Sequence, residues 1–161
     1  MTIEIGQRIP AVKFKRVLAD GSVVELDTAE EFAGKQMILV GVPGAYTPTC
    51  SKEHLPSYVA HADELRAKGV GGIVCMATND HFVMRAWADE QEAEGKVDML
   101  ADGNGELTRA LGLEVDLSGY KLGPRCKRFV AKFDDGVLSS LDIETGGGIS
   151  ETGAEACLAR L

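Results

Sequence analysis

The amino-acid sequence predicts a single α/β domain in which a central mixed β-sheet is flanked by helices. Its 161 residues, 45% of them apolar, are enough to bury one core. Two short apolar runs have the character of strands that are buried on both faces, and amphipathic segments with a helical period alternate with them. No repeat, low-complexity tract or linker divides the chain. We therefore expect residues 1–161 to form one domain.

The N-terminal part of the chain predicts a β-hairpin followed by a buried strand. Residues Val12–Leu18 alternate between apolar and polar, Asp20-Gly21 is a turn signal, and Val23–Leu26 returns. Met37–Val42 is apolar on both faces, which is typical of a central strand. The predicted sheet thus begins with an N-terminal hairpin and continues into its centre.

The middle of the chain alternates helix and strand. A helix is expected from Ser51 to Lys68, with Gly69 as its C-terminal stop. Val70–Ala77 is a second buried strand. Asn79-Asp80 then caps a helix that ends near Gly95.

The last third predicts shorter elements and a second hairpin. Val97–Leu100 is a short strand and Glu106–Leu111 a short helix. Phe129–Phe133 and Val137–Ile143 form the hairpin, and a final helix is expected over residues 151–161. A thioredoxin-like α/β sandwich fits this order of elements.

Composition excludes several functions. The net charge of −8 argues against nucleic acid or an anionic membrane as partner, and no apolar run approaches the roughly 18 residues of a membrane span. The N-terminus has no signal-peptide pattern, so we expect a cytoplasmic protein. Gly146-Gly147-Gly148 lacks the Gly-Lys-Ser/Thr of a phosphate loop and predicts a turn. The four cysteines have neither CxxC nor zinc-ligand spacing, so no metal is expected; they are Cys50, Cys75, Cys126 and Cys157.

Cys50 lies where the first buried strand gives way to a helix. Open α/β sheets place ligand sites at the carboxyl ends of their strands, and the free N–H groups of a helix start stabilise a thiolate. Prolines stiffen the approach, Gly44 permits a tight turn, and Thr47 could place a hydroxyl beside the sulfur. An arbitrary cysteine here would more often be a buried filler. This surrounding pattern favours a chemical role.

The segment from Pro43 to Ser51, Pro-Gly-Ala-Tyr-Thr-Pro-Thr-Cys-Ser, with His54-Leu55-Pro56 after it, closely resembles the active-site segment of type II (fifth-type) peroxiredoxins. This resemblance implies a thioredoxin fold and the reduction of hydrogen peroxide or organic hydroperoxides, in the service of antioxidant defence. It implies no metal, flavin or haem. It spans most of the chain and continues through Lys68-Gly69-Val70, Val74-Cys75, Asn79-Asp80, Phe82-Val83, Trp87, Glu94-Gly95-Lys96-Val97, Leu100-Ala101-Asp102 and Lys127-Arg128-Phe129.

The resemblance assigns roles to individual residues. Cys50 matches the peroxidatic cysteine, Thr47 the threonine whose hydroxyl holds the peroxide, and Pro43 the proline that shields the pocket. Arg125 and Arg128 compete for the role of the remote catalytic arginine. Alignment on the strand that follows assigns it to Arg128, which leaves Arg125 at the rim.

The resemblance also implies a pocket rim, partners and an assembly. Gly44, Tyr46 and Tyr120 are expected at the rim of the substrate pocket or at a homodimer contact. The reductant is expected to be glutathione with glutaredoxin, or thioredoxin. Neither nucleic acid nor a membrane is expected as a partner.

The thiol that resolves oxidised Cys50 stays open at this point. Some family members carry a resolving cysteine in the loop before the last helix, but residues 145–152 contain none here. Cys75 occupies a position that other members use, although its buried strand favours a core role. Cys157 and Cys126 are weaker candidates. Without an internal thiol, the external reductant would act on Cys50 directly.

Two alternatives to a peroxidase remain. Cys50 could serve only as the switch of a non-catalytic peroxide sensor. His54 lies four residues after Cys50 and could instead act as the base of a cysteine hydrolase, although helix neighbours rarely align in this way, and a structural or rim histidine is favoured.

Overall fold

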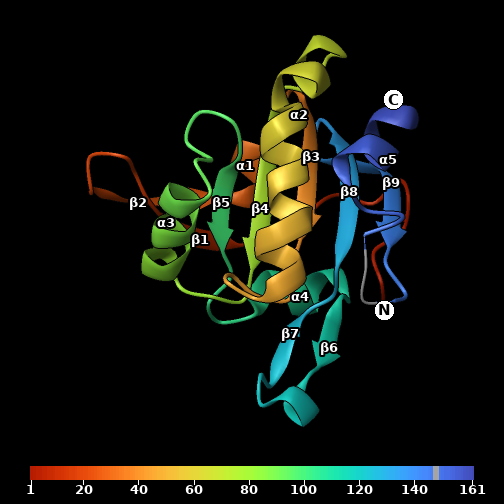
Figure 1. Ribbon diagram of the computed structural model, residues 1–161. Coiled ribbons are helices and arrows are strands. Elements are labelled where there is room, and N and C mark those ends of the chain that lie inside the picture. The colour runs from red at the N-terminus through yellow and green to blue at the C-terminus, as the bar shows by residue number, and fades with distance from the viewer. Residues whose placement is uncertain (147–148) are drawn as a thin grey trace.

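The computed structural model describes residues 1–146 and 149–161, so the turn predicted at Gly146–Gly148 lies largely outside the described residues. Seven strands form one sheet in the order β2-β1-β5-β4-β3-β8-β9 (Figure 1). β3, β4 and β5 run parallel, and the other pairings of this sheet are antiparallel. The strands are β1 (Lys13–Val17), β2 (Val23–Asp27), β3 (Gln36–Gly41), β4 (Gly72–Ala77), β5 (Asp98–Ala101), β8 (Phe129–Asp134) and β9 (Val137–Ile143).

Helices cover both faces of this sheet (Figure 1). Alternate side chains of β3 point to opposite faces, as a strand requires. Ile38 and Val40 belong to one buried cluster together with Leu65 and Trp87, whereas Leu39 belongs to the other. The mixed sheet between helices and its N-terminal hairpin are therefore confirmed. The first face carries α2 (Leu55–Ala67), α3 (His81–Glu90) and α5 (Ala154–Ala159), and the second carries α1 (Thr28–Glu31) and α4 (Glu106–Leu111).

The helix predicted from Ser51 onward begins differently from the expectation. Residues Cys50–His54 form a single π-helical turn, in which the Leu55 N–H donates to the Cys50 carbonyl, and α2 begins only at Leu55. The cause is Pro56, which has no N–H to bond back to Lys52. The wide turn places this proline in the first turn of α2, where no intrahelical N–H is required. Cys50 thus opens a turn that an ordinary α-helix would not provide.

Two further features depart from the sequence prediction. The final helix spans only Ala154–Ala159, because residues 150–152 are held by contacts outside it. A small arm of β6 (Glu114–Asp116) and β7 (Pro124–Cys126), joined around a 3₁₀ turn at Ser118–Tyr120, was not predicted. Strands this short show no periodicity. Figure 1 shows that the arm projects beyond the edge at which the central parallel strands end.

Candidate active site

The sulfur of Cys50 lies at the carboxyl edge of β3, in a position closed to solvent. The whole residue is 0% exposed. Two polar groups contact its Sγ atom: Thr47 Oγ1 at 2.8 Å and Arg128 Nη2 at 3.3 Å. One comes from the preceding loop and the other from a residue 78 positions later. The fold therefore places a hydroxyl and a permanent cation on a single thiol.

Thr47 has one hydroxyl hydrogen and two neighbours that can accept it. Its Oγ1 lies 2.8 Å from the Gly44 carbonyl oxygen and 2.8 Å from Cys50 Sγ. The hydroxyl can donate to the carbonyl while the thiol S–H donates to Oγ1. When the thiol has lost its proton, the same hydroxyl can turn to the thiolate. Thr47 can thus serve either protonation state of the sulfur.

Arg128 reaches the sulfur because β8 pairs with β3. The register joins Gly41 to Phe129, so Arg128 lies at the end of β3 beside the loop that carries Cys50. Its Nη2 donates to Cys50 Sγ, and its Nη1 contacts His54 Nδ1 at 2.9 Å. A guanidinium holds its donors in a fixed plane, so these two contacts fix its orientation.

Arg125 takes a different place. Its Nη1 donates to the Pro43 carbonyl oxygen at 3.4 Å, and its Nε donates to the Leu122 carbonyl oxygen at 2.9 Å. It crosses Gly44 so closely that a Cβ there would stand 2.9 Å from Nη1. A side chain at position 44 would have to displace the end of Arg125. Arg128, rather than Arg125, contacts the sulfur.

His54 is buried and holds Arg128 rather than Cys50. Since a guanidinium only donates, Nδ1 must accept from Arg128; Nε2 therefore carries the hydrogen and donates to the Thr152 carbonyl oxygen at 3.0 Å. Burial, together with the charge of Arg128, lowers the pKa of His54 to about 4. A histidine whose Nδ1 already accepts from arginine and whose Nε2 is protonated cannot act as a base toward Cys50. This geometry counts against the hydrolase interpretation.

Sequence reasoning assigned no role at the site to two residues that support the Cys50 loop, Trp87 and Asn79. Trp87 Nε1 donates to Ser51 Oγ at 2.9 Å, and the Ala45 N–H donates to Asn79 Oδ1 at 2.9 Å. Tyr46 adopts a φ of 66°, which is uncommon for a residue with a side chain. The two hydrogen bonds connect residues more than thirty positions apart. No local pattern could have predicted them.

The other three cysteines are also buried, and none of the four forms a disulfide in the described part of the chain. Cys75 lies within β4, paired with both β3 and β5. Burial raises the pKa of the Cys75, Cys126 and Cys157 thiols. A raised pKa leaves little thiolate, which is the form that attacks an oxidised sulfur.

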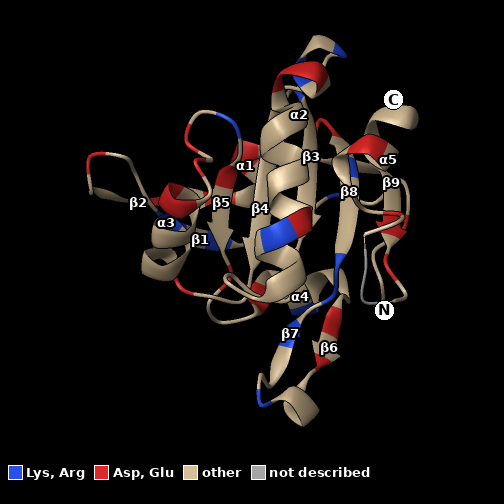
Figure 2. Cartoon of the chain, viewed as in Figure 1, with Lys and Arg blue, Asp and Glu red and all other residues tan. Residues whose placement is uncertain are grey.

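Charge and exposure around the site are uneven. Basic residues gather on β7 and on the two residues that join it to β8, although the chain as a whole is acidic (Figure 2); they are Arg125, Lys127 and Arg128. Tyr46 is 48% exposed, and Tyr120 is 77% exposed on the arm.

In the described part of the chain, no three His, Cys, Asp or Glu side chains gather as metal ligands do. No helix among those residues is long and apolar enough to cross a membrane.

Comparisons with known proteins agree with this geometry. The Redoxin family model matches residues 4–158. Peroxiredoxin-2E-2, chloroplastic, from Oryza sativa subsp. japonica is 44% identical and covers 99% of this chain and 73% of its own. Peroxiredoxin-2B from Arabidopsis thaliana is 40% identical over 90% of this chain and 95% of its own. The crystal structure of reduced Prx3 in complex with H₂O₂ from Vibrio vulnificus superposes with a TM-score of 0.93, at 42% identity and with 99% of each chain covered.

The thioredoxin-like fold and these matches define an enzyme of the thiol peroxidase class, active in antioxidant defence, and the chain belongs to the peroxiredoxins. Within that family it is a type II peroxiredoxin, the group of its relatives at 40–47% identity. The family resemblance noted from the Cys50 segment is confirmed. The alternative of a non-catalytic sensor is not favoured.

Proposed function

We propose that Cys50 is the peroxidatic residue and reduces hydrogen peroxide and organic hydroperoxides by direct attack. The thiolate sulfur forms a bond to one peroxide oxygen as the O–O bond breaks. The other oxygen leaves as hydroxide or alkoxide and takes up a proton, giving water or an alcohol. Cys50 is left as a sulfenic acid. The observation that carries this proposal is the pair of contacts that Thr47 and Arg128 make to Cys50 Sγ.

The surrounding residues have separate tasks in this step. Negative charge grows on the leaving oxygen, and Arg128 supplies a fixed cation with several donors to stabilise it. The hydroxyl of Thr47 donates or accepts a hydrogen bond, depending on which neighbouring atom carries the proton. Pro43, whose carbonyl oxygen accepts from Arg125, walls the pocket and limits water. Because Cys50 is buried, the peroxide must enter as the loop or the π-helical turn opens.

The sulfenic acid is resolved by an external thiol. Support for this comes from the burial of Cys75 in the centre of the sheet, where disulfide formation would break the pairing with β3 or β5. Glutathione with glutaredoxin, or thioredoxin, then reduces Cys50 directly, in the reducing setting of the cytoplasm. Cys75 stays a candidate resolving residue only if β4 unfolds locally.

Turnover and mass spectrometry test this route together. Hydroperoxide consumption is measured with glutathione and glutaredoxin, and separately with thioredoxin and its reductase. We expect turnover that Cys50→Ser abolishes and Cys75→Ser preserves. Peroxide-treated protein should carry a sulfenic acid or a glutathione adduct on Cys50. A Cys50–Cys75 disulfide, with turnover lost in Cys75→Ser, would overturn the external route.

The exposed aromatic residues near this edge support a homodimer. Tyr46 and Tyr120 expose large aromatic surfaces, and Phe82 on α3 is 64% exposed. In this arrangement Tyr46 and Tyr120, with Gly44 beneath, complete the rim of the pocket at the contact between two copies. Sedimentation at micromolar concentration should show a dimer that Tyr120→Glu dissociates. A monomer for the unmodified protein would refute this assembly.

A further inference from the structure

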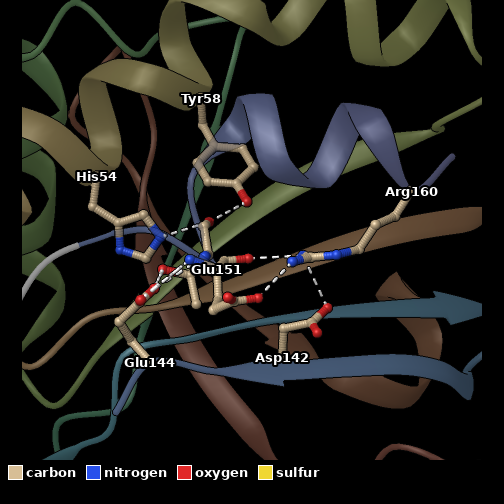
Figure 3. Close-up of polar contacts among 7 residues, drawn as sticks. His54, Tyr58, Asp142, Glu144, Glu151 and Arg160 are labelled. Carbon is tan, nitrogen blue, oxygen red and sulfur yellow. Dashed lines mark hydrogen bonds and ion pairs between the residues drawn. The ribbon is translucent and has the colours of Figure 1, made fainter. Parts of the chain in front are cut away.

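Arg128 belongs to a closed ring of hydrogen bonds that leaves the active site and returns to it. The Arg128 carbonyl oxygen accepts from the Glu144 N–H at 2.9 Å, and Glu144 Oε2 accepts from the Thr152 N–H at 3.0 Å. The Thr152 carbonyl oxygen accepts from His54 Nε2, and His54 Nδ1 accepts from Arg128. Figure 3 shows His54 above and Glu144 below, both reaching toward the segment between them and α5. The ring thus ties both the backbone and the guanidinium of Arg128.

The carboxylate of Glu144 is the part of this ring with the most contacts. It accepts from Ser150 Oγ at 2.6 Å, from the Glu151 N–H at 3.0 Å, and from both the N–H and the hydroxyl of Thr152. Partial burial acts to raise the pKa of Glu144, but these hydrogen bonds outweigh it and hold the pKa below its ordinary value. An ionised carboxylate accepts at both oxygens, which an amide cannot do. Glu144 therefore fixes where the Thr152 carbonyl points.

That carbonyl determines the state of His54. Thr152 O accepts from His54 Nε2 and from the Tyr58 hydroxyl, at 3.0 and 2.6 Å (Figure 3). Since the carbonyl can only accept, it keeps the hydrogen on Nε2 and leaves Nδ1 free to accept from Arg128. If the carbonyl moved, His54 could turn or change tautomer, and Arg128 would lose one of its two fixed contacts.

We propose that Glu144 is a positioning residue of the peroxidase site, which acts through the Thr152 carbonyl and His54 to aim Arg128 at Cys50. The inference rests on the peroxidase function of Cys50. It assigns a role in the reaction to a carboxylate that directly follows β9 and does not contact the sulfur. The ring also makes the segment before α5 part of the active site, although that segment carries no cysteine.

Glu144→Gln tests the proposal, with Asp142→Asn as its matched control. Both changes remove one negative charge from neighbouring positions on the same side of the sheet. Asp142 contacts Arg160 and takes no part in the ring (Figure 3). Two quantities are measured in each protein: the second-order rate of Cys50 oxidation by hydrogen peroxide, and the pH dependence of Cys50 alkylation by iodoacetamide, located by mass spectrometry.

For Glu144→Gln we expect oxidation to slow roughly tenfold, the size of one lost hydrogen bond to a charged group, and Cys50 alkylation to require higher pH. Asp142→Asn should match the unmodified protein within about twofold. The sign of the alkylation shift is decisive. Removing a negative charge through space alone would stabilise the thiolate and move alkylation to lower pH.

Thr152→Val is the second variant, because it removes only the hydroxyl donor and keeps the backbone contacts of the ring. We expect a slowing of about threefold in the same direction. A loss of thermal stability in Glu144→Gln without change in rate or alkylation would overturn the proposal, as would alkylation at lower pH. An unmodified protein that did not react with peroxide would instead count against the peroxidase function, and the alkylation experiment would still test the positioning of Arg128.

Discussion

At the scale of single residues, the reactivity of Cys50 depends on how its sulfur is surrounded. Thr47 and Arg128 contact Sγ from two sides, and His54 holds the guanidinium from a third position. The site is built so that its donors are in place before the O–O bond breaks, which avoids reorganisation during the reaction.

Thr47→Val should remove the hydroxyl and keep the shape of the side chain. We expect the peroxide reaction to slow by about 10²-fold or more, the usual cost of losing a preorganised donor in such a site. Thr47→Ser retains the hydroxyl and should keep most of the rate. The second-order rate constant with hydrogen peroxide measures both. Equal rates for Thr47→Val and the unmodified protein would remove Thr47 from the mechanism.

The lowered pKa of His54 predicts that the folded protein loses stability in mild acid. Its pKa is about 4 in the folded protein, below the usual 6.5, because it is buried and faces Arg128, while the hydrogen bond to the Thr152 carbonyl and the charge of Glu144 act in the opposite direction. Below pH 6.5, His54 binds a proton in the unfolded chain but stays neutral in the folded chain. The free energy of unfolding therefore falls as the pH drops toward about 4. The full effect is on the order of 3 kcal/mol.

His54→Gln is the control, because its amide offers both an N–H donor group and a carbonyl acceptor and does not titrate. Urea unfolding at several pH values gives the difference in free energy between the two proteins, from which the other titrating groups cancel. As the pH falls from 6.5 to 4, the free energy of unfolding of the unmodified protein should decrease relative to that of His54→Gln. A difference independent of pH would show that His54 is not buried in its neutral form.

At the scale of elements, the pairing of β3 with β8 carries Arg128 to the site. A Cβ on Gly41 would stand 2.0 Å from Cε1 of Phe129, the residue after Arg128. Gly41→Ala should therefore force the two strands apart, destabilise the protein by about 2–3 kcal/mol and slow the peroxide reaction.

Gly72→Ala on β4 is the matched control for this prediction. A Cβ there would meet only the end of the Met37 side chain, at 2.9 Å, and that flexible end can move aside. Chemical denaturation and the peroxide rate are measured on both variants. Similar losses in the two would mean that the contact of Gly41 with Phe129 has no special importance.

The sequence predicts elements wherever periodicity is strong, and fails where structure depends on distant contacts. The two hairpins and the buried strands β3 and β4 follow from alternation and apolar runs, which the packed sheet retains. The π-helical turn at Cys50 was missed, because its cause is one missing N–H at Pro56. The β6–β7 arm was missed because its strands are too short to show a pattern.

In the active site, too, residues close together in the sequence could be predicted, and roles that depend on distant contacts could not. Cys50 and Thr47 lie three residues apart and are recognisable together, whereas Arg128 was assigned by family resemblance alone. From the sequence, His54 was considered as a possible base for Cys50, which lies near it in the chain. Its partners in the fold are instead Arg128 and Thr152, 74 and 98 residues away. Contacts at such separations depend on the completed fold, and no spacing rule predicts them.

At the scale of the whole molecule, basic residues lie at the reactive edge of an otherwise acidic chain, next to the acidic Glu114 and Asp116 of β6. The chain carries a net charge of −8, yet basic residues cluster near Cys50 on β7 and on the two residues that join it to β8 (Figure 2). In the proposed cycle, an external reductant approaches this edge and must reach a buried sulfur, so the Cys50 turn has to open. The proposed dimer contact lies beside the same edge, through the exposed Tyr120 of the arm.

The most direct test of the account is one oxidation of Cys50 by hydrogen peroxide without any reductant. Trp87, the single tryptophan, donates to Ser51 beside the reactive cysteine, so its fluorescence should report the event in stopped flow. We expect a rapid change that saturates at one equivalent of peroxide, persists in Cys75→Ser and disappears in Cys50→Ser, with mass spectrometry locating the added oxygen on Cys50. An unmodified protein that reacts no faster than free cysteine, or a Cys50→Ser variant that keeps the rapid phase, would contradict the account.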